Sequence, residues 1–448
     1  MTLDPIKIFY IPVVIAALIS YAYLPREQAT NRTTDRPNIL VIMPDDLGWS
    51  DVGYQGSSIK TPNIDNLAKS GIRLTQQYVM PTCTPTRVSL MTGLYPSRYG
   101  VTAPAYGQVI DLGDPTLASI LTANGYATSI VGKWHMGSPP YTPLKYGFQS
   151  SYGYFDGQID PYTHEYKTGR KSWHRDDVLF EETGHATDLI TKEAIRIIEM
   201  QRNRPFFLYV AYSTPHYPLE EPEKWTQMYA EISMSSSRKL FAASVTHMDS
   251  GIGEIIDALD RSGHRQNTLV LFISDNGGQL DWHNATHYHG KYADKPHQVL
   301  GNNFPLRGWK TDLYEGGIRV PAILNWPGHL EVGVIDVPIH IADWLPTLCY
   351  LAGSDQAVKK LDRDGQNIWP FIAGMTTDYT GHTMYWNTGR QHAIREGPWK
   401  LLLNSQSKQV ELYNLTNDFR ETQDLSNTEP QKREHLLKVL EAFQKKDR

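Results

Sequence analysis

Short apolar runs separated by helical patterns constrain the fold of this chain more than any other feature of its sequence. The runs cover residues 38–43, 127–131, 206–211, 268–273 and 320–324. Runs of this length without polar alternation are typical of strands that are buried on both faces of a parallel sheet. Helical patterns lie between them, at residues 62–70, 116–124, 186–200 and 237–262. The alternation predicts an α/β fold with a large, mainly parallel sheet sandwiched by helices.

The sequence changes in character near residue 375. Short strand-like segments follow at close spacing, at residues 382–386, 391–395, 399–403 and 411–414, and a charged helical segment covers 431–445. These patterns predict a small antiparallel sheet of four strands with one packed helix. We therefore expect a large domain over residues 37–374 and an α+β subdomain over residues 375–448.

The first 24 residues have the pattern of an export signal. Lys7 precedes an apolar run over residues 9–24, and Ser20-Tyr21-Ala22 has the small-residue spacing of a cleavage site. A membrane span usually needs about 18 or more apolar residues, so a cleaved signal peptide is favoured over an uncleaved anchor. Both alternatives predict an exported protein in a periplasmic, secreted or lysosome-like setting. Only the anchor would bring a stable membrane partner.

Charge limits the kind of partner that this chain is expected to bind. It has 43 Lys and Arg residues against 48 Asp and Glu residues, a formal net charge of −5. This balance predicts no nucleic-acid partner, and it requires that any anionic substrate be held by cations gathered locally.

Carboxylate and amide side chains follow two of the predicted strands. Asp45 and Asp46 come directly after the first run, and Asp275 and Asn276 come after the fourth. Two adjacent buried carboxylates need a cation, and an all-oxygen ligand set favours Ca²⁺ or Mg²⁺ over zinc. An isolated Asp pair would more often be a solvated turn or helix cap, but two strand ends with the same chemistry favour a metal site.

One of the two cysteines has unusual neighbours. Cys83 begins the run Cys83-Thr84-Pro85-Thr86-Arg87, which leads into a helical pattern. A helix N-terminus and a nearby guanidinium both favour an anionic or electron-rich group at this position. The alternatives are a reactive or merely buried thiol, or a disulfide with Cys349. Because Cys349 lies in an apolar helical stretch, a buried core thiol is favoured there.

Further cationic or basic side chains occur where strands and turns end. They are Arg87, Lys133, His135, His216 and Lys310. Each alone has an ordinary interpretation, such as a surface lysine or a capped loop histidine. Lys310 is unusual because it lies in a turn-rich segment, residues 305–317, just before a buried strand.

In combination these motifs resemble those of the type I sulfatases, a family with an alkaline-phosphatase-like fold. Within the family, the sequence pattern is most similar to arylsulfatase B and the bacterial glycan sulfatases. The resemblance covers most of residues 37–420. It rests on residues 37–49, 61–65, 83–93, 132–135, 274–278, 306–317 and 411–421. Thr86 departs from the pattern because the family usually has serine there. Both residues carry a small hydroxyl group, so we still expect modification of Cys83.

The resemblance implies a formylglycine-dependent sulfuric ester hydrolase with its catalytic domain at residues 37–374. A formylglycine-generating enzyme would convert Cys83 to formylglycine, whose hydrate attacks sulfur. Calcium, favoured over magnesium, would be bound by Asp45, Asp46, Cys83, Asp275 and Asn276. Arg87 and Lys133 would orient the diol, and His135 would accept its second proton. His216 and Lys310 would bind the sulfate oxygens and help to protonate the leaving alcohol.

The resemblance also suggests a sulfated carbohydrate substrate, such as a 4-sulfated galactose or N-acetylgalactosamine unit of a polysaccharide or glycosaminoglycan. Aromatic residues are plentiful, and residues 152–165 and the loop 281–304 are the segments expected to contact sugar rings. The predicted sugar contacts are His164, His287, His289 and Lys291. Two alternatives stay open, namely a phosphate or phosphonate hydrolase of the same superfamily and a catalytically inactive protein that binds sulfated glycans.

Overall fold

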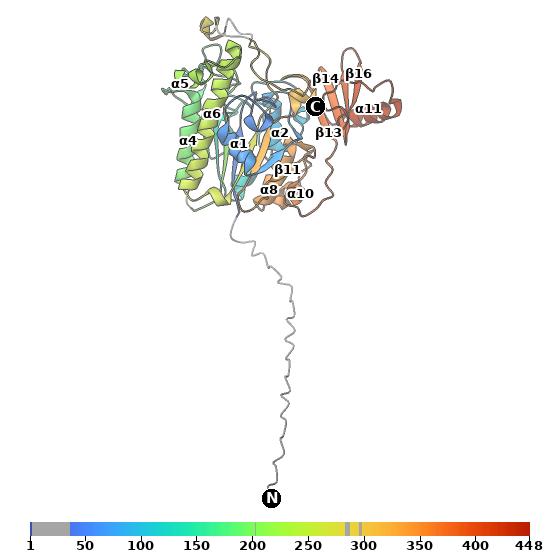
Figure 1. Ribbon diagram of the computed structural model, residues 1–448, viewed down its shortest axis with the longest axis horizontal. Coiled ribbons are helices and arrows are strands. Elements are labelled where there is room, and N and C mark those ends of the chain that lie inside the picture. Colours follow the sequence, from blue (N-terminus) through green and yellow to red (C-terminus); the bar gives the residue numbers. More distant parts are fainter. Residues whose placement is uncertain (2–35, 202, 283–286, 295–297) are drawn as a thin grey trace. The chain divides into compact units, whose positions relative to one another are not determined.

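The computed structural model describes residues 1, 36–201, 203–282, 287–294 and 298–448 (Figure 1). Residues 36–448 form one compact unit. The predicted signal peptide or anchor at residues 1–24 lies, apart from Met1, outside the described residues. Among the residues that the structure does describe, no helix is both long and apolar enough to cross a bilayer.

A ten-stranded sheet forms the centre of this unit, with the order β11-β2-β10-β9-β1-β8-β4-β5-β6-β7. Its strands are β1 (Asn38–Met43), β2 (Ile72–Leu74), β4 (Ala127–Lys133), β5 (Ser150–Tyr154), β6 (Trp173–Arg175), β7 (Val178–Leu179), β8 (Phe206–Ala211), β9 (Thr268–Ile273), β10 (Ala322–Asn325) and β11 (Gly333–Ile335). The five neighbours from β9 to β5 pair in parallel. The predicted parallel sheet is therefore confirmed at its centre.

Strand β10 differs from the expectation because it runs antiparallel to both β9 and β2. The chain leaves β9 at the carboxyl edge of the sheet, and Lys310, in the connection to β10, lies beside Asp46 at that same edge. Since the connection does not cross to the other edge, the chain must enter β10 from the carboxyl side and run in the opposite direction.

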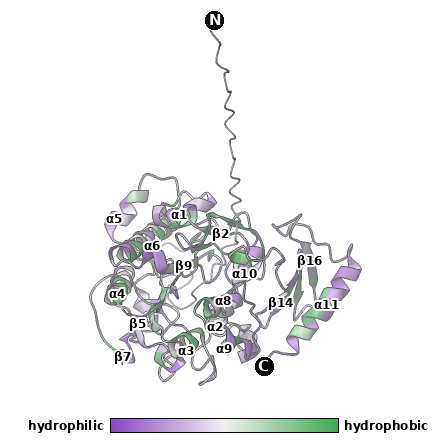
Figure 2. Cartoon of the chain, turned by 90° about the horizontal axis from the view of Figure 1, so that it is seen from below, coloured by the Kyte–Doolittle hydropathy of each residue, from purple (hydrophilic) through white to green (hydrophobic). Residues whose placement is uncertain are grey.

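Helices cover both faces of the sheet, which explains why the central strands are continuously apolar. Ile39, Val41 and Met43 pack into one core, and Leu40 and Ile42 pack into the other. Figure 2 shows α4 and α6 on one side of β9 and α2 and α8 on the other. The helices of this part are α1 (Pro62–Lys69), α2 (Cys83–Thr92), α3 (Leu117–Ala123), α4 (Ala186–Met200), α5 (Glu223–Thr226), α6 (Ser236–Arg261), α7 (Glu315–Ile318), α8 (Trp344–Leu351), α9 (Asp355–Lys359) and α10 (Trp369–Ile372). A two-stranded sheet joins β3 (Gln77–Tyr78) and β12 (Ile339–His340).

The predicted C-terminal elements are confirmed (Figure 1). Four strands pair antiparallel in the order β13 (Met384–Asn387), β14 (Gln391–Glu396), β15 (Trp399–Asn404) and β16 (Val410–Asn414). Helix α11 (Pro430–Gln444) buries Leu436 and Leu440 in the apolar cluster that includes Leu401 of β15 and Leu412 of β16. The domain boundary at residues 374 and 375 stays a prediction.

A buried ion cluster joins this C-terminal sheet to α7. Lys400 Nζ lies 2.9 Å from Glu315 Oε1 and 2.8 Å from Glu421 Oε1, and all three side chains are fully buried. Glu421 Oε2 also accepts a hydrogen bond of 2.7 Å from the backbone N–H of Glu315. The cluster therefore fixes the N-terminus of α7, which directly follows the segment that carries Lys310.

The Lys400→Met variant is expected to be strongly destabilised, by about 3–5 kcal/mol, because it leaves two buried carboxylates without their cation. Urea denaturation measures the change in the free energy of unfolding. The control is Lys438→Met, which removes an exposed partner of Glu434 on α11 and should cost less than about 0.5 kcal/mol. Equal costs for the two variants would contradict the assigned role of the buried cluster.

Candidate functional site

Four oxygen-bearing side chains meet where two neighbouring parallel strands end. Asp45 and Asp46 follow β1, while Asp275 and Asn276 follow β9, and each is at most 1% exposed. The Asp46 N–H donates to Asp275 Oδ1 at 3.1 Å, and Asn276 Nδ2 donates to Asp46 Oδ1 at 2.8 Å. The carboxyl ends of the strands thus bring together the ligand set that the sequence predicted.

This group has the chemistry of a cation site. Asp45 Oδ1 and Asn276 Oδ1 are buried and have no hydrogen-bond partner among the described residues. Burial raises the pKa of Asp45 to about 8, against the opposing effect of Lys133. Unpaired buried oxygens are costly unless a cation binds them. Asp45, Cys83 and Asp275 each place a ligand atom within 4.8 Å of the others, so the donor set fits a hard divalent cation next to Cys83.

Cys83 is the first residue of α2 and is 2% exposed. Both cysteines are free and buried, so the alternative of a Cys83–Cys349 disulfide is wrong. Burial raises the pKa of the Cys83 thiol, which makes the unmodified side chain a weak nucleophile. The conversion of Cys83 to formylglycine stays a prediction.

Two hydroxyl groups secure the first turn of α2. Thr84 Oγ1 donates to His135 O at 3.0 Å. Thr86 Oγ1 accepts from Met80 N at 3.0 Å and donates to Met80 O at 3.1 Å. The position at which this chain departs from the family motif therefore still uses a hydroxyl group, and threonine supplies it.

Three cationic side chains each contact one of the predicted metal-ligating carboxylates. Arg87 Nη2 donates to Asp275 Oδ2 at 2.8 Å, Lys133 Nζ donates to Asp45, and Lys310 Nζ donates to Asp46 Oδ2 at 2.8 Å. Although burial opposes ionisation of Asp46, the charges of Lys310 and Lys133 favour it, and the pKa of Asp46 is lowered to about 2. The site thus holds three fixed positive charges, which suit the recognition of an anionic group.

The two predicted catalytic histidines are neutral when the site is empty of substrate. Burial lowers the pKa of His135 and of His216 well below the usual value, and nearby cations add to the effect. Neither ring nitrogen of His135 has a hydrogen-bond partner among the described residues. His216 Nε2 lies 3.7 Å from Asp46 Oδ2. His135 is therefore in the protonation state that a proton acceptor needs.

The four predicted sugar contacts have different surroundings. His164 is 2% exposed, hydrogen-bonds Gly184 O through Nε2 at 3.0 Å and stacks on Trp173. Lys291 Nζ is 2.8 Å from both Asp160 and Glu220. The remaining two, His287 and His289, lie in the segment His287–Gly290, in which Tyr288 and His289 have left-handed backbone angles. Part of the predicted sugar-contacting loop 281–304 lies outside the described residues. Sugar binding by all four histidine and lysine side chains stays a prediction.

The structure adds two residues to the site that the sequence did not indicate. Tyr209 on β8 accepts a hydrogen bond of 3.0 Å from Arg87 Nη1. Gly157 lies against His135, since a Cβ at this glycine would come within 2.5 Å of His135 Nε2. Tyr209 lies in the apolar run 206–211, where its phenol could not be distinguished from an ordinary core ring, and no pattern marked Gly157.

Comparison with known proteins decides the family. The model of the family described as Sulfatase matches residues 37–354. The chain belongs to the sulfatase family. Mouse arylsulfatase J is 31% identical over 94% of this chain and 78% of its own length. Human N-acetylgalactosamine-6-sulfatase is 33% identical over 81% of this chain and 72% of its own length.

Solved sulfatase structures agree with the fold. The crystal structure of Ps i-CgsB in complex with k-i-k-neocarrahexaose superposes with a TM-score of 0.81 at 31% identity, covering 93% of this chain and 94% of that one. Together with the family match, this identifies the protein as a sulfuric ester hydrolase with the alkaline-phosphatase-like fold. Sulfatases typically use formylglycine and a divalent metal, and the group around Cys83 provides candidate metal ligands for this sulfatase.

The Lys310→Met variant of this sulfatase is expected to lower kcat/KM by about 10²- to 10³-fold, because it removes a fixed positive charge from the reacting group. Steady-state hydrolysis of an aryl sulfate measures the effect. Lys438→Met, which alters only an exposed lysine, is the control. A change of less than threefold for Lys310→Met would contradict the placement of Lys310 at the sulfate.

Proposed function

We propose that this sulfatase hydrolyses a sulfate ester of a carbohydrate, using formylglycine made from Cys83 and a calcium ion. The observation that supports the proposal most is that Arg87, Lys133 and Lys310 pair with the carboxylates of the site. Beside them, Asp45 Oδ1 and Asn276 Oδ1 are buried with no hydrogen-bond partner among the described residues. Such a site suits a small anion whose charge must be stabilised during reaction. The maturation partner would be a formylglycine-generating enzyme.

The proposed calcium ion and formylglycine would each supply one chemical function. Calcium, held by Asp45, Asp46, Asp275, Asn276 and the modified Cys83, would act as a Lewis acid. Formylglycine would supply, in its hydrated form, a hydroxyl nucleophile and a second hydroxyl whose loss of a proton releases sulfate. An unmodified serine or cysteine has no second hydroxyl, so it could not complete the second half of the reaction.

The chain's own residues bind the substrate and stabilise charge. Lys310 and His216 both lie near Asp46 Oδ2 and would bind the sulfate oxygens. Arg87 and Lys133 would fix the orientation of the modified side chain at position 83, because both are locked by ion pairs to buried carboxylates. A site organised in advance in this way spends little energy on reorganisation during the reaction.

Proton transfer is divided between the two histidines and a lysine. His135, neutral and unpartnered among the described residues, would accept the proton that the second hydroxyl loses. Lys310 and His216 would protonate the leaving alcohol. Although the empty site keeps His216 neutral, the negative charge of a bound sulfate ester favours its protonated form.

The substrate sugar is proposed from the sequence features already described and from the names of the relatives. Curated relatives include N-acetylgalactosamine-6-sulfatases, and a similar structure holds k-i-k-neocarrahexaose. A galactose-type sugar sulfated at position 4 is our proposed substrate, with 6-sulfation as the competing outcome. His164, His287, His289 and Lys291 are the proposed sugar contacts. Such a substrate fits an exported enzyme acting in a periplasmic, secreted or lysosome-like setting.

Two measurements separate the proposed activity from its alternatives. The first compares kcat/KM on an aryl sulfate with that on the matching phosphate and phosphonate, and the proposal requires a clear preference for sulfate. The second measures sulfate release from defined oligosaccharides sulfated at position 4 or 6. A preference for phosphate would establish a phosphohydrolase, and an unmodified, inactive protein that binds sulfated glycans would establish the catalytically inactive alternative.

A further inference from the structure

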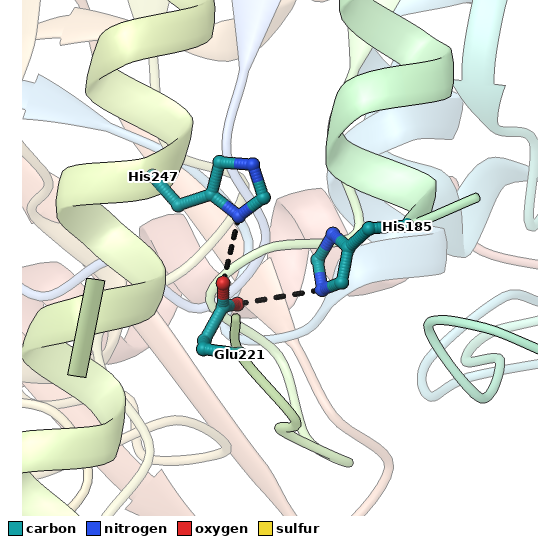
Figure 3. A group of neighbouring side chains, drawn as sticks. All are labelled: His185, Glu221 and His247. Carbon is teal, nitrogen blue, oxygen red and sulfur yellow. Dashed lines mark hydrogen bonds and ion pairs between the residues drawn. The ribbon is translucent and has the colours of Figure 1, made fainter. Parts of the chain in front are cut away.

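A second group of buried ionisable side chains lies outside the catalytic site. Figure 3 shows its members, His185, Glu221 and His247. His247 comes from the middle of α6, His185 immediately precedes α4, and Glu221 lies five residues after the catalytic candidate His216. The side chains of the three are at most 3% exposed, so their charges must be balanced within the group.

The hydrogen bonds of His185 show that it is a poor metal ligand. Its Nδ1 accepts from the backbone N–H of Thr187 at 3.2 Å. Nε2 must then carry the proton, and it donates to Glu220 O at 3.0 Å. A neutral imidazole used in this way has no lone pair left for a metal ion. The group is therefore better described as a network of protons and carboxylates than as a second metal site.

His247 has a carboxylate at each ring nitrogen. Nδ1 lies 2.7 Å from Glu221 Oε2, and Nε2 lies 3.0 Å from Asp188 Oδ1. Since a carboxylate accepts, both nitrogens must donate, and His247 is an imidazolium. Burial alone would lower the pKa of His247, but the hydrogen bonds to Asp188 and Glu221 outweigh burial and raise it to about 9. The pKa of His185 is lowered, chiefly by burial.

The groups that face His247 come from three elements packed around it. Helix α4 contributes Asp188 and its N-cap His185, the segment before α5 contributes Glu220 and Glu221, and α5 contributes Lys224 and the Trp225 ring, which stacks on His247. His247 thus places a positive charge between the carboxylates of Asp188 and Glu221.

Glu221 is connected to His216 by a stiff piece of chain. Pro218 lies between the two residues and has a fixed backbone φ angle. Leu219 is 1% exposed and packs in the core beside α4 and α6. Only four residues separate Glu221 from His216, and one of them is a proline, so the position of Glu221 limits the positions that His216 can take.

The same segment reaches the predicted sugar contacts. Glu220 Oε2 lies 2.8 Å from Lys291 Nζ, and it accepts a hydrogen bond of 3.1 Å from the hydroxyl of Tyr292. The anchoring of Glu221 therefore fixes the position of its neighbour Glu220 as well.

We propose that His247 is a positioning residue for sulfate hydrolysis, which holds Glu221 and thereby keeps His216 at the bound sulfate. The proposal rests on the role given to His216 in the proposed function. Its pH dependence follows from the raised pKa of His247. The anchoring is complete below about pH 6.5, the ordinary pKa of histidine, and is lost as the pH rises through about 9.

The first test uses His247→Gln. Glutamine retains much of the volume but carries no charge and can donate to only one of the two carboxylates. We expect kcat to fall by about 10- to 100-fold, the cost of a small misplacement of a catalytic group. The wild-type kcat should decline as the pH rises through about 9, and this decline should be absent in the variant. His435→Gln is the matched control, because His435 forms a 2.7 Å pair with Glu396 at the surface.

A second variant covers the case in which His247→Gln does not fold. Glu221→Gln keeps His247 and the packing but removes one negative charge, so the alkaline decline should move to lower pH. Nitrogen NMR of labelled histidines provides a readout that does not depend on activity. The His247 signals, assigned by their loss in His247→Gln or their shift in Glu221→Gln, should titrate near pH 9 in the wild type.

The outcomes distinguish this proposal from the proposed function. If His216→Ala keeps full activity while His247 titrates near pH 9, His216 does not act in catalysis. The positioning role proposed for His247 is then wrong as well. If His216→Ala is inactive but Glu221→Gln leaves the alkaline decline in place, only the positioning role is overturned. Stoichiometric zinc that is lost in His247→Gln would also overturn it, in favour of a second metal site.

Discussion

The Cys83→Ala variant is expected to lose sulfatase activity by about 10⁴-fold or more, as is usual when a nucleophile is removed. Alanine fits the space of Cys83, which is buried at the start of α2, so the fold should be kept. Sulfate release from an aryl sulfate measures the loss. Circular dichroism and the melting temperature check that the variant folds.

The Cys83→Ser variant gives a sharper version of the same test. A serine hydroxyl can attack sulfur once but cannot expel sulfate as a hydrated aldehyde can. We therefore expect at most one equivalent of alcohol per enzyme and no continuing turnover. Sustained turnover by Cys83→Ser, or by wild-type protein whose Cys83 peptide has the mass of the unmodified thiol, would contradict the role of formylglycine.

Loss of the cation should also lower the sulfatase activity strongly. Asp45→Asn keeps the shape of the side chain but removes a negative charge from the group that Lys133 contacts. Because a metal ion contributes several kcal/mol to charge stabilisation, we expect kcat/KM to fall by about 10³-fold. Treatment of the wild type with a chelator should have the same effect, and added calcium should restore it.

Ligand-dependent stability provides an independent measure of the cation site. A cation that binds only the folded protein raises the melting temperature as its concentration increases. Calcium should therefore raise the melting temperature of the wild type and of Asp355→Asn, whose exposed pair with Lys359 lies on α9. Asp45→Asn should respond far less. An equal response of all three proteins would place calcium elsewhere.

The sequence predicted the central strands and the ligands at their ends because both depend on local pattern and parallel pairing. Residues 39–43 are apolar at every position, and β1 buries them alternately in two cores. Asp45 and Asp275 meet because β1 and β9 are parallel neighbours. Once the two strands are adjacent, their carboxyl ends must bring these carboxylates together.

Contacts between distant residues were not predictable in this way. Lys400 meets Glu315 across 85 positions, and His247 meets Glu221 across 26. Nothing in the local pattern distinguishes these side chains from solvated ones, since charged residues are usually exposed unless a partner pairs with them. The direction of β10 depended likewise on where the preceding loop lies.

The most direct test of the central claim is a crystal structure of the protein produced together with a formylglycine-generating enzyme, with anomalous scattering used to identify any bound ion. We expect formylglycine at position 83 and one divalent cation bound by the side-chain oxygens of Asp45, Asp46, Asp275 and Asn276. A mature, active protein with an unmodified thiol at position 83, or with no ion among these four side chains, would contradict it.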